Sequence, residues 1–256
     1  MGALDGRHAL ITGGGTGIGA AIARALAGAG ASVSIAGRRR APLDEVVASL
    51  ENAVAITADV TRESDCEAMA NEARKVHGPI DIVIANAGMA DSAPVARIDL
   101  AHWQRTIDVN LTGAFLTVKS ALADITRKHS GPSGRVIFIA SKAGLKGYPY
   151  VAAYCAAKHG VVGLARALSI ELAPTGVTVN AICPGYTDTP LLAKASAKLA
   201  AKTGRSAEDS RSAFARDNDE GRLITPEEVA QKVLWLCLPD ADAINGQAIS
   251  ISGAVP

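Results

Sequence analysis

Several features that define other classes of protein are missing from this chain of 256 residues. No segment reaches the roughly 18 consecutive apolar residues that are typical of a membrane-spanning helix. Neither a Pro/Ser-rich linker nor an internal repeat divides the chain. The formal net charge is only +1, which gives no general electrostatic case for binding nucleic acid or an anionic membrane surface. These absences argue against a membrane protein, a repeat array and a nucleic-acid-binding protein.

Cysteine is scarce as well. The four cysteines, Cys66, Cys155, Cys183 and Cys237, show neither the pairing of a disulfide framework nor the spacing of metal ligands. They indicate buried thiols in a cytoplasmic protein. No cluster of His, Cys and Asp suggests a metal site, so we predict that no metal is bound. Residues 1–8 contain charge and no long apolar run, so we expect no signal peptide.

What the chain does contain predicts one α/β domain. Hydrophobic residues make up 48% of it and charged residues 20%, which is enough for a large core. Short apolar runs alternate with longer helical patterns. The expected strands are His8–Thr12, Ser32–Ala36, Ala53–Thr57, Ile80–Ala85, Arg135–Ala140, Val177–Ile182 and Gln247–Ile251. The expected helices are 17–29, 41–51, 62–77, 99–128, 152–172 and 226–237. This alternation predicts a doubly wound parallel sheet with helices on both faces, a Rossmann fold over residues 1–256.

A glycine-rich loop, Thr12–Gly19, follows the first expected strand and opens the first expected helix. Gly13 suits a tight turn, Gly17 allows the backbone to approach a pyrophosphate, and Gly19 allows close helix packing. The free N–H groups of the helix N-terminus attract phosphate. No Lys-Ser/Thr pair follows, so the loop is not a P-loop. The predicted phosphate-binding residues are Gly13, Gly15, Thr16, Gly17, Ile18 and Gly19.

The second expected strand is followed by glycine and arginine rather than by an acidic residue. An acidic side chain near this position binds the ribose 2′-hydroxyl of NAD. Here Gly37 leaves room, and Arg38, with Arg39, can hold a 2′-phosphate through charge-assisted hydrogen bonds. The sequence therefore favours NADP, with NAD as the alternative. A basic cluster at the start of a helix can also be solvated surface.

A tyrosine and a lysine four residues apart mark a possible proton-transfer site. Tyr154 and Lys158 lie in the helical run Val151–Leu172, where positions four apart share one face. A free phenol titrates near pH ~10, and a nearby cation lowers that pKa by ~1–3 units. We therefore expect Lys158 to bring Tyr154 closer to neutral pH. Such pairs also occur by chance on exposed helices.

Taken in order, the motifs resemble those of the short-chain dehydrogenase/reductase family. The motifs are the Thr12–Gly19 loop, Asp59-Val60, Asn86-Ala87-Gly88, Asn110, Ser141, Tyr154-x-x-x-Lys158 and Pro184-Gly185. The resemblance runs from His8 to Gly253 and includes 3-oxoacyl reductases and 3-hydroxyacyl dehydrogenases. One departure is Ala85, where most members have asparagine.

The resemblance implies further cofactor contacts. Asp59 would bond the adenine amino group, beside the backbone of Val60. Residues Asn86, Ala87 and Gly88 would steady the sheet and line the adenosine ribose. The backbone of Ile182 and the turn after it would fix the nicotinamide carboxamide. The residues expected in that turn are Pro184, Gly185, Thr187 and Thr189.

The resemblance also implies the catalytic group Asn110, Ser141, Tyr154 and Lys158. Ser141 would orient the substrate oxygen while Tyr154 transfers a proton to it. Lys158 would lower the pKa of the tyrosine and bond the nicotinamide ribose, and Asn110 would bend its helix and hold a water against the lysine. The implied reaction is hydride transfer between NAD(P) and a carbonyl or secondary alcohol.

Specificity is expected in a polar insertion at about 190–222. Lys194, Lys198 and Lys202 recur every four residues, so they form one basic stripe on a helix. The stripe could bind a coenzyme A or acyl-carrier thioester, or it could be solvated surface. The leading prediction is an NADP-preferring reductase of such a thioester or a similar ketone. The alternatives are an NAD-dependent 3-hydroxyacid or 3-hydroxyacyl dehydrogenase and a non-catalytic nucleotide-binding regulator. The resemblance further implies a homotetramer.

Overall fold

A computed structural model describes residues 2–127, 134–204 and 206–252. It contains one parallel seven-stranded sheet in the order β3-β2-β1-β4-β5-β6-β7. The strands are β1 His8–Thr12, β2 Ser32–Gly37, β3 Ala53–Thr57, β4 Ile82–Ala85, β5 Arg135–Ile139, β6 Thr178–Pro184 and β7 Ala248–Ile251. The helices are α1 Gly17–Gly28, α2 Arg40–Val47, α3 Glu63–His77, α4 Leu100–Ile107, α5 Gly113–Ile125, α6 Ala152–Glu171, α7 Pro190–Thr203, α8 Ala207–Arg216 and α9 Pro226–Cys237. The predicted doubly wound fold is confirmed.

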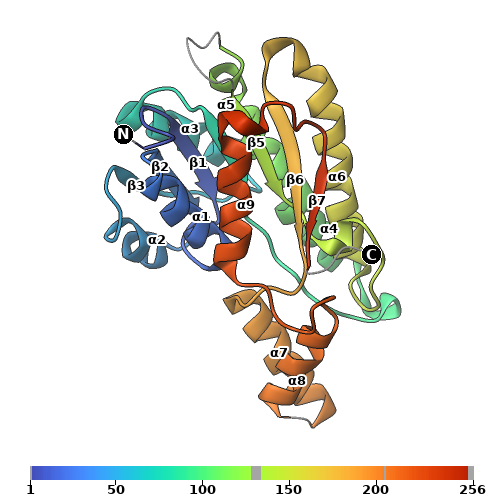
Figure 1. Cartoon of the computed structure of the whole chain (residues 1–256). Coiled ribbons are helices and arrows are strands. Elements are labelled where there is room, and N and C mark those ends of the chain that lie inside the picture. The colour runs from blue at the N-terminus through green and yellow to red at the C-terminus, as the bar shows by residue number, and fades with distance from the viewer. Residues whose placement is uncertain (1, 128–133, 205, 253–256) are drawn as a thin grey trace.

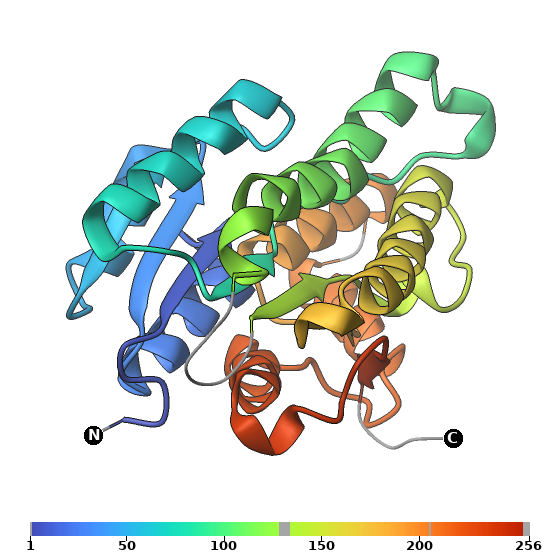
Figure 2. The ribbon, with the colours of Figure 1, turned by 90° about the horizontal axis from the view of Figure 1, so that it is seen from above.

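The sheet lies between two layers of helices, as Figure 2 shows from above. Helices α3, α5 and α6 cover one face, while α1, α2 and α9 cover the other. Strands β1, β4, β5 and β6 are buried along their whole length. Strands covered on both faces read as continuous apolar runs, which is why the sequence pattern located them.

Several strand bounds differ from their predicted positions by one or two residues, and the largest differences are in β4 and β6. The fourth strand begins at Ile82 rather than Ile80, and the carboxylate of Asp81, just before it, accepts the N–H of His8 at 2.8 Å. The sixth strand continues beyond Ile182 to Pro184, which pairs with Ile251 of β7. Strand β6, which leads to the turn expected to bind the nicotinamide, is therefore longer than predicted.

The long helix expected at 99–128 is interrupted. Helix α4 ends at Ile107, a π-helical turn covers Asp108–Thr112, and α5 begins at Gly113. The last predicted residue, at position 128, lies outside the described residues. Because a π turn holds one residue more than an α turn, it shifts the direction of the side chains that follow.

The predicted insertion forms α7 and α8, which pack against each other beyond the edge where β6 ends (Figure 1). The insertion is attached to the sheet at its base. Thr187 and Ile224 form a parallel bridge, and Asp188 N donates to Ile224 O at 2.8 Å. Within the described part of the chain, no helix is long and apolar enough to span a membrane.

Candidate active site

The glycine loop crosses from β1 to α1 in a conformation that larger residues would not adopt. Gly13 and Gly17 have φ angles of +68° and +53°. A Cβ on Gly19 would lie 2.3 Å from the carbonyl oxygen of Gly13, so only glycine allows this approach. Thr16 is the N-cap of α1 but makes no capping hydrogen bond through its side chain, and the first turn contains no acidic residue. The N-terminal N–H groups of α1 therefore remain suited to an anion.

The other predicted loop residues contact neighbouring elements. A Cβ on Gly15 would lie 3.2 Å from the backbone of Pro42 and Leu43 in α2, so the loop passes close to that helix. Ile18 packs against the hydrophobic core under α1. The start of the loop is also fixed to β2, because Gly13 N and Gly14 N donate to Ala36 O at 2.7 and 3.2 Å.

Three arginines follow β2 with different surroundings. Arg38 and Arg39 are exposed, and neither forms an ion pair with another described residue. Arg40 instead donates to Asp44 at 2.7 Å. Gly37 has no atom closer than 3.7 Å to the place of a Cβ. Two cations beside open space therefore remain able to meet a phosphate, as the sequence predicted for NADP.

Asp59 lies after β3, near this cluster. Partial burial raises its pKa, but two hydrogen bonds from Thr61 and the charges of Arg38 and Arg62 outweigh burial and hold the pKa below its ordinary value. Its Oδ1 atom accepts both Thr61 bonds, at 2.8 and 3.0 Å. The neighbouring Val60 is buried against Gly113 of α5. Asp59 is thus an ionised hydrogen-bond acceptor at the strand end.

The Asn86-Ala87-Gly88 turn joins the glycine loop to the catalytic group. The Asn86 side-chain amide donates to the carbonyl oxygens of Thr12 and Gly13 at 2.9 and 3.2 Å. The N–H groups of Asn86 and Ala87 both point to the Thr12 hydroxyl, at 3.2 and 3.3 Å. A Cβ on Gly88 would lie 3.0 Å from Asn110 Oδ1 and 3.7 Å from Lys158 Nζ. A side chain at position 88 would therefore crowd Asn110 and contact Lys158.

Asn110 sits within the π turn and is 1% exposed. Its Nδ2 atom donates to the carbonyl oxygens of Thr106 and Met89, each at 2.9 Å, and its Oδ1 accepts from Met89 N at 3.1 Å. In an uninterrupted α-helix the backbone N–H of residue 110 would bond the Thr106 carbonyl. The side chain takes over that bond, which explains why asparagine is tolerated and the helix departs from α geometry here.

Ser141, Tyr154 and Lys158 converge between β5 and α6. Ser141 lies two residues after the end of β5, and its hydroxyl accepts from Ala143 N at 3.1 Å. Lys158 is 4% exposed, and its Nζ donates to Ile139 O at 2.8 Å. The same Nζ lies 5.7 Å from the centroid of the Tyr154 ring. The predicted catalytic side chains are therefore neighbours, although their chemical roles stay predictions.

The prediction that Lys158 lowers the pKa of Tyr154 is wrong when only the protein's own groups act on the phenol. Burial raises the pKa of Tyr154 to about 12, although the residue keeps some exposure and a hydrogen bond with Ser141 acts in the opposite direction. Burial also lowers the pKa of Lys158 to about 8. Because a buried ammonium is itself costly, its charge does not offset the desolvation of the phenol. Tyr154 is thus a protonated phenol at neutral pH.

The segment after β6 runs from the sheet to α7 past the glycine loop. A Cβ on Gly17 would lie 3.1 Å from Thr189 Cγ2, so these two predicted cofactor segments touch. The Thr189 hydroxyl caps α7 by accepting from Leu192 N at 3.3 Å and also donates to Thr187 O at 3.2 Å. The Thr187 hydroxyl in turn donates to Gly185 O at 3.0 Å.

The expected contact of Ile182 does not fit this geometry. Ile182 is fully buried inside β6, and its carbonyl accepts from Ala140 N at 2.7 Å. The strand continues to Pro184, so the backbone that leaves the sheet begins at Gly185. A carboxamide-binding backbone is therefore expected at residues 185–189 instead of at Ile182.

The basic stripe of the insertion is only partly free. Lys194 and Lys202 are exposed on α7, whereas Lys198 forms an ion pair with Asp91 and donates to Ser92 O at 2.9 Å. Lys198 thus joins α7 to the loop after β4. Sequence analysis missed this pair because the partners are 107 positions apart and carry no shared motif.

Two residues that the sequence did not single out hold the insertion in place. Asn218 is buried, accepts from Tyr186 N at 2.9 Å and donates to Tyr186 O at 2.8 Å. Asp219 accepts from Lys142 at 3.0 Å and from the Ser252 hydroxyl at 2.9 Å. Because Lys142 follows Ser141 directly, the base of the insertion is fastened beside the catalytic group.

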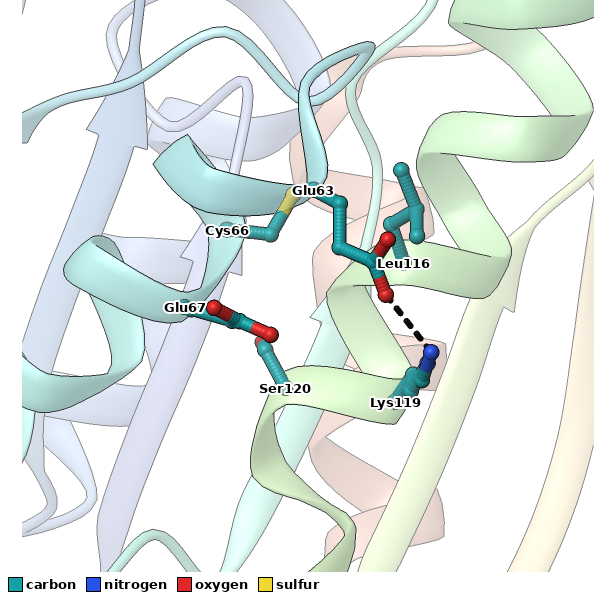
Figure 3. A pocket seen from close by; sticks show the side chains of 6 residues that line it. All are labelled: Glu63, Cys66, Glu67, Leu116, Lys119 and Ser120. Atoms are coloured by element: carbon teal, nitrogen blue, oxygen red, sulfur yellow. Dashed lines mark hydrogen bonds and ion pairs between the residues drawn. The ribbon is translucent and has the colours of Figure 1, made fainter.

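A separate pocket of about 170 Å³ lies between α3 and α5 (Figure 3). Its lining residues are Glu63, Cys66, Glu67, Leu116, Lys119 and Ser120. The Glu63–Lys119 ion pair, at 2.6 Å, crosses it. No predicted site residue lines this pocket, so it is distinct from the candidate active site. Among the described residues, no group of three His, Cys, Asp or Glu side chains could hold a metal ion.

Comparisons with known proteins give consistent matches over the length of the chain. A family model described as short chain dehydrogenase matches residues 7–200. D-beta-hydroxybutyrate dehydrogenase of Rhizobium meliloti is 37% identical, with 96% of each chain covered. Cis-4-hydroxycyclohexanecarboxylate dehydrogenase of Sinomonas cyclohexanicum is 36% identical, covering 96% of this chain and 95% of that protein. The crystal structure of a variant actinorhodin polyketide ketoreductase with NADPH superposes with a TM-score of 0.90, at 34% identity and 96% coverage of each chain.

Proposed function

The chain belongs to the short-chain dehydrogenase family, and from this premise we propose that it is an NADP-preferring reductase of a ketone or 3-oxoacyl thioester. As a family member it is an NAD(P)-dependent oxidoreductase of a carbonyl/alcohol pair. The observation that supports the proposal best is the convergence of Ser141, Tyr154 and Lys158 beside Gly88, at the end of the sheet that holds the glycine loop. We further propose that residues 1–256 act as one domain, with residues 190–222 as the substrate loop.

The residues at this edge fit a dinucleotide. The uncapped N-terminus of α1 faces the place of the phosphates, and Gly13 and Gly17 keep the loop free of side chains there. Arg38 and Arg39 would bind a 2′-phosphate, while ionised Asp59 would accept the adenine amino group. When bound, the nicotinamide supplies the hydride for reduction.

The protein's own side chains then bind and protonate the substrate oxygen. Tyr154 donates its phenolic proton to that oxygen, and Ser141 orients and polarises it by hydrogen bonding. A phenol with a raised pKa is fully protonated at neutral pH, which suits an acid in the reductive direction. Lys158 stabilises the phenolate that remains and would bond the nicotinamide ribose. Asn110 orders the Met89 backbone next to the lysine.

A second candidate is an NAD-dependent dehydrogenase of a 3-hydroxyacid. It is favoured by the likeness to a D-beta-hydroxybutyrate dehydrogenase. Exposed Arg38 and Arg39, with no acidic residue in their place, argue for NADP instead. A non-catalytic regulator would have no need of Ser141, Tyr154 and Lys158 together. We also propose a cytoplasmic homotetramer, with α4, α5 and α6 at one interface, where Trp103 and Phe115 are exposed.

The thioester proposal is supported by the free part of the basic stripe. Exposed Lys194 and Lys202 can meet the phosphates of coenzyme A or an acyl-carrier protein, while Lys198 is engaged with Asp91. Arg205, a further basic residue of the insertion, lies outside the described residues. Loss of thioester activity but not of simple ketone activity in a Lys194→Gln/Lys202→Gln variant is the expected sign of this role.

The experiment that tests the function is a paired titration with NADPH and NADH, followed by turnover. Fluorescence titration gives the two dissociation constants. The tighter cofactor is then assayed in its reduced form with simple ketones and 3-oxoacyl thioesters, and in its oxidised form with 3-hydroxyacids. We expect tighter binding of NADPH and its oxidation by a ketone or thioester. Tighter binding of NADH with turnover of a 3-hydroxyacid alone would support the second candidate. Binding without turnover of any substrate would contradict both.

A further inference from the structure

Aromatic residues are rare in this chain, which has two tryptophans, four tyrosines and three phenylalanines. Three of them, Tyr148, Tyr186 and Phe214, nevertheless form one cluster. The rings of Tyr148 and Tyr186 meet edge to face with centroids 6.2 Å apart. The rings of Tyr186 and Phe214 are tilted at 44° with centroids 4.8 Å apart. These are favourable arrangements for aromatic pairs.

The cluster lies next to the candidate catalytic group. Tyr148 belongs to the loop between Ser141 and Tyr154, and Tyr186 directly follows the Pro184–Gly185 turn. Phe214 reaches the cluster from α8 of the insertion. Asn218 accepts from Tyr186 N at 2.9 Å, and the next residue, Asp219, accepts at 3.0 Å from Lys142, which directly follows Ser141. The backbone that carries Tyr186 is therefore tied to the segment that carries Ser141.

The three rings are not part of either hydrophobic core. Each keeps intermediate exposure, and none belongs to the buried clusters on the two faces of the sheet. Their backbone is nevertheless fixed: the Asn218 side chain bonds both the N–H and the carbonyl of Tyr186. Arg211 of α8 holds Asp188 with two hydrogen bonds of 2.8 and 2.5 Å. The cluster is thus a rigid, partly exposed surface and not a packing core.

We propose that Tyr148, Tyr186 and Phe214 form an aromatic wall that selects ketones carried on a planar or cyclic ring system. The inference rests on the proposed reductase function and deepens it. Aliphatic side chains would serve a linear acyl chain equally well, whereas an aromatic wall offers ring faces and edges that favour a second ring. Because the wall combines the loop after β5, the turn after β6 and the insertion, it forms only when α8 is in place.

The test compares 2-tetralone with 2-decanone, a fused-ring and a linear ketone of equal carbon number, with NADPH as the reductant. We expect the wild-type protein to have the higher kcat/KM for 2-tetralone. Phe214→Leu should lower that kcat/KM about 3- to 10-fold, mainly through KM, because a lost aromatic contact has this size. The kcat/KM for 2-decanone should change less than about twofold. The conservative variant Phe214→Tyr should keep the wild-type preference for 2-tetralone. Tyr148→Leu should act in the same direction as Phe214→Leu.

Val76→Ala is the control, because this exposed side chain lies on α3, outside the cluster and outside the proposed subunit interface, and should change neither value. Equal kcat/KM for both ketones in the wild type, or equal losses for both in Phe214→Leu, would overturn the aromatic wall and leave the reductase function intact. Absence of any NADPH-dependent carbonyl reduction, with thioesters included, would instead refute the proposed function. If Phe214→Leu melts early, the wild-type preference and Tyr148→Leu still decide the question.

Discussion

The two edges of the sheet use polar side chains in opposite ways. At the amino-terminal edge, Asp81 accepts from His8 N at 2.8 Å and from Arg127 at 2.5 Å, while buried Arg135 pairs with Asp242. At the carboxyl-terminal edge, Arg38 and Arg39 pair with no described residue, and α1 has no side-chain cap. One edge satisfies its charges internally, and the other leaves donors and cations for a ligand.

This difference indicates which edge of the sheet serves function and which serves stability. Ligands of open α/β sheets bind outside the carboxyl ends of the strands. The opposite edge has no such task, so its charged groups can be buried and mutually bonded. Substitutions at the carboxyl edge should therefore reduce activity with little change in stability, and substitutions at the amino edge should do the reverse.

Ser141→Ala should produce a large separation of this kind, exceeded only by substitution of Tyr154. We expect kcat to fall by about 10²–10³-fold, because a hydrogen-bond donor to the substrate oxygen is lost. The serine also accepts from Ala143 N at 3.1 Å, a local bond whose loss should shift the melting temperature only slightly. Steady-state kinetics and thermal unfolding on the same sample measure both. A large drop in melting temperature with normal kcat would contradict the assignment.

Asp81→Ala should show the opposite behaviour at the amino edge. It leaves Arg127 and the His8 N–H without their carboxylate, and loss of one partner of a buried pair costs about 3 kcal/mol. Urea unfolding measures the loss of free energy. At a temperature where the variant is folded, its kcat/KM should equal that of the wild type, and a reduced value would break the proposed separation.

Arg38→Ser should weaken NADPH binding about 10- to 100-fold and leave NADH binding unchanged, because a charge-assisted bond to the 2′-phosphate contributes about 1.5–3 kcal/mol. Arg40→Ser is the matched control, since Arg40 is already paired with Asp44. Fluorescence titration of both variants with both cofactors gives the answer. Equal losses for NADPH and NADH would remove Arg38 from the 2′-phosphate site.

The smallest effect is expected from pH acting on a histidine pair at the amino edge. His8 Nδ1 donates to Gly78 O at 2.9 Å, so in the neutral ring Nε2 accepts from the Ser34 hydroxyl at 2.8 Å. Burial lowers the pKa of His8 and of adjacent His77 below the ordinary value of 6.5. In mild acid these two histidines therefore bind protons in the unfolded chain but stay neutral in the folded protein. The free energy of unfolding falls as the pH drops below about 6.5.

Thermal unfolding between pH 5 and 7 checks this expectation. The melting temperature of the wild type should fall on acidification. His8→Gln should make it depend less on pH, because one of the two histidines with a lowered pKa is removed. The same slope in both proteins would place the acid sensitivity elsewhere.

The fold and most of the candidate site could be predicted because their signals are local. Buried strands read as apolar runs, and the glycine loop is continuous in sequence. The resemblance implied a bend at Asn110, but the π form of the turn at Asp108–Thr112 could not be predicted, since it depends on bonds from Asn110 to Met89, 21 positions away. The Lys198–Asp91 pair and the raised pKa of Tyr154 also depend on tertiary neighbours and burial. Spacing alone placed Lys158 near the phenol but could not show that desolvation outweighs its charge.

The central claim is that Tyr154 transfers the proton at an edge that binds the cofactor independently of it. Parallel measurement of kcat and of the NADPH dissociation constant in Tyr154→Phe tests it most directly. We predict that kcat falls by about 10²–10⁴-fold and that the dissociation constant for NADPH stays within about twofold of the wild-type value. Near-normal turnover in this variant would contradict the account.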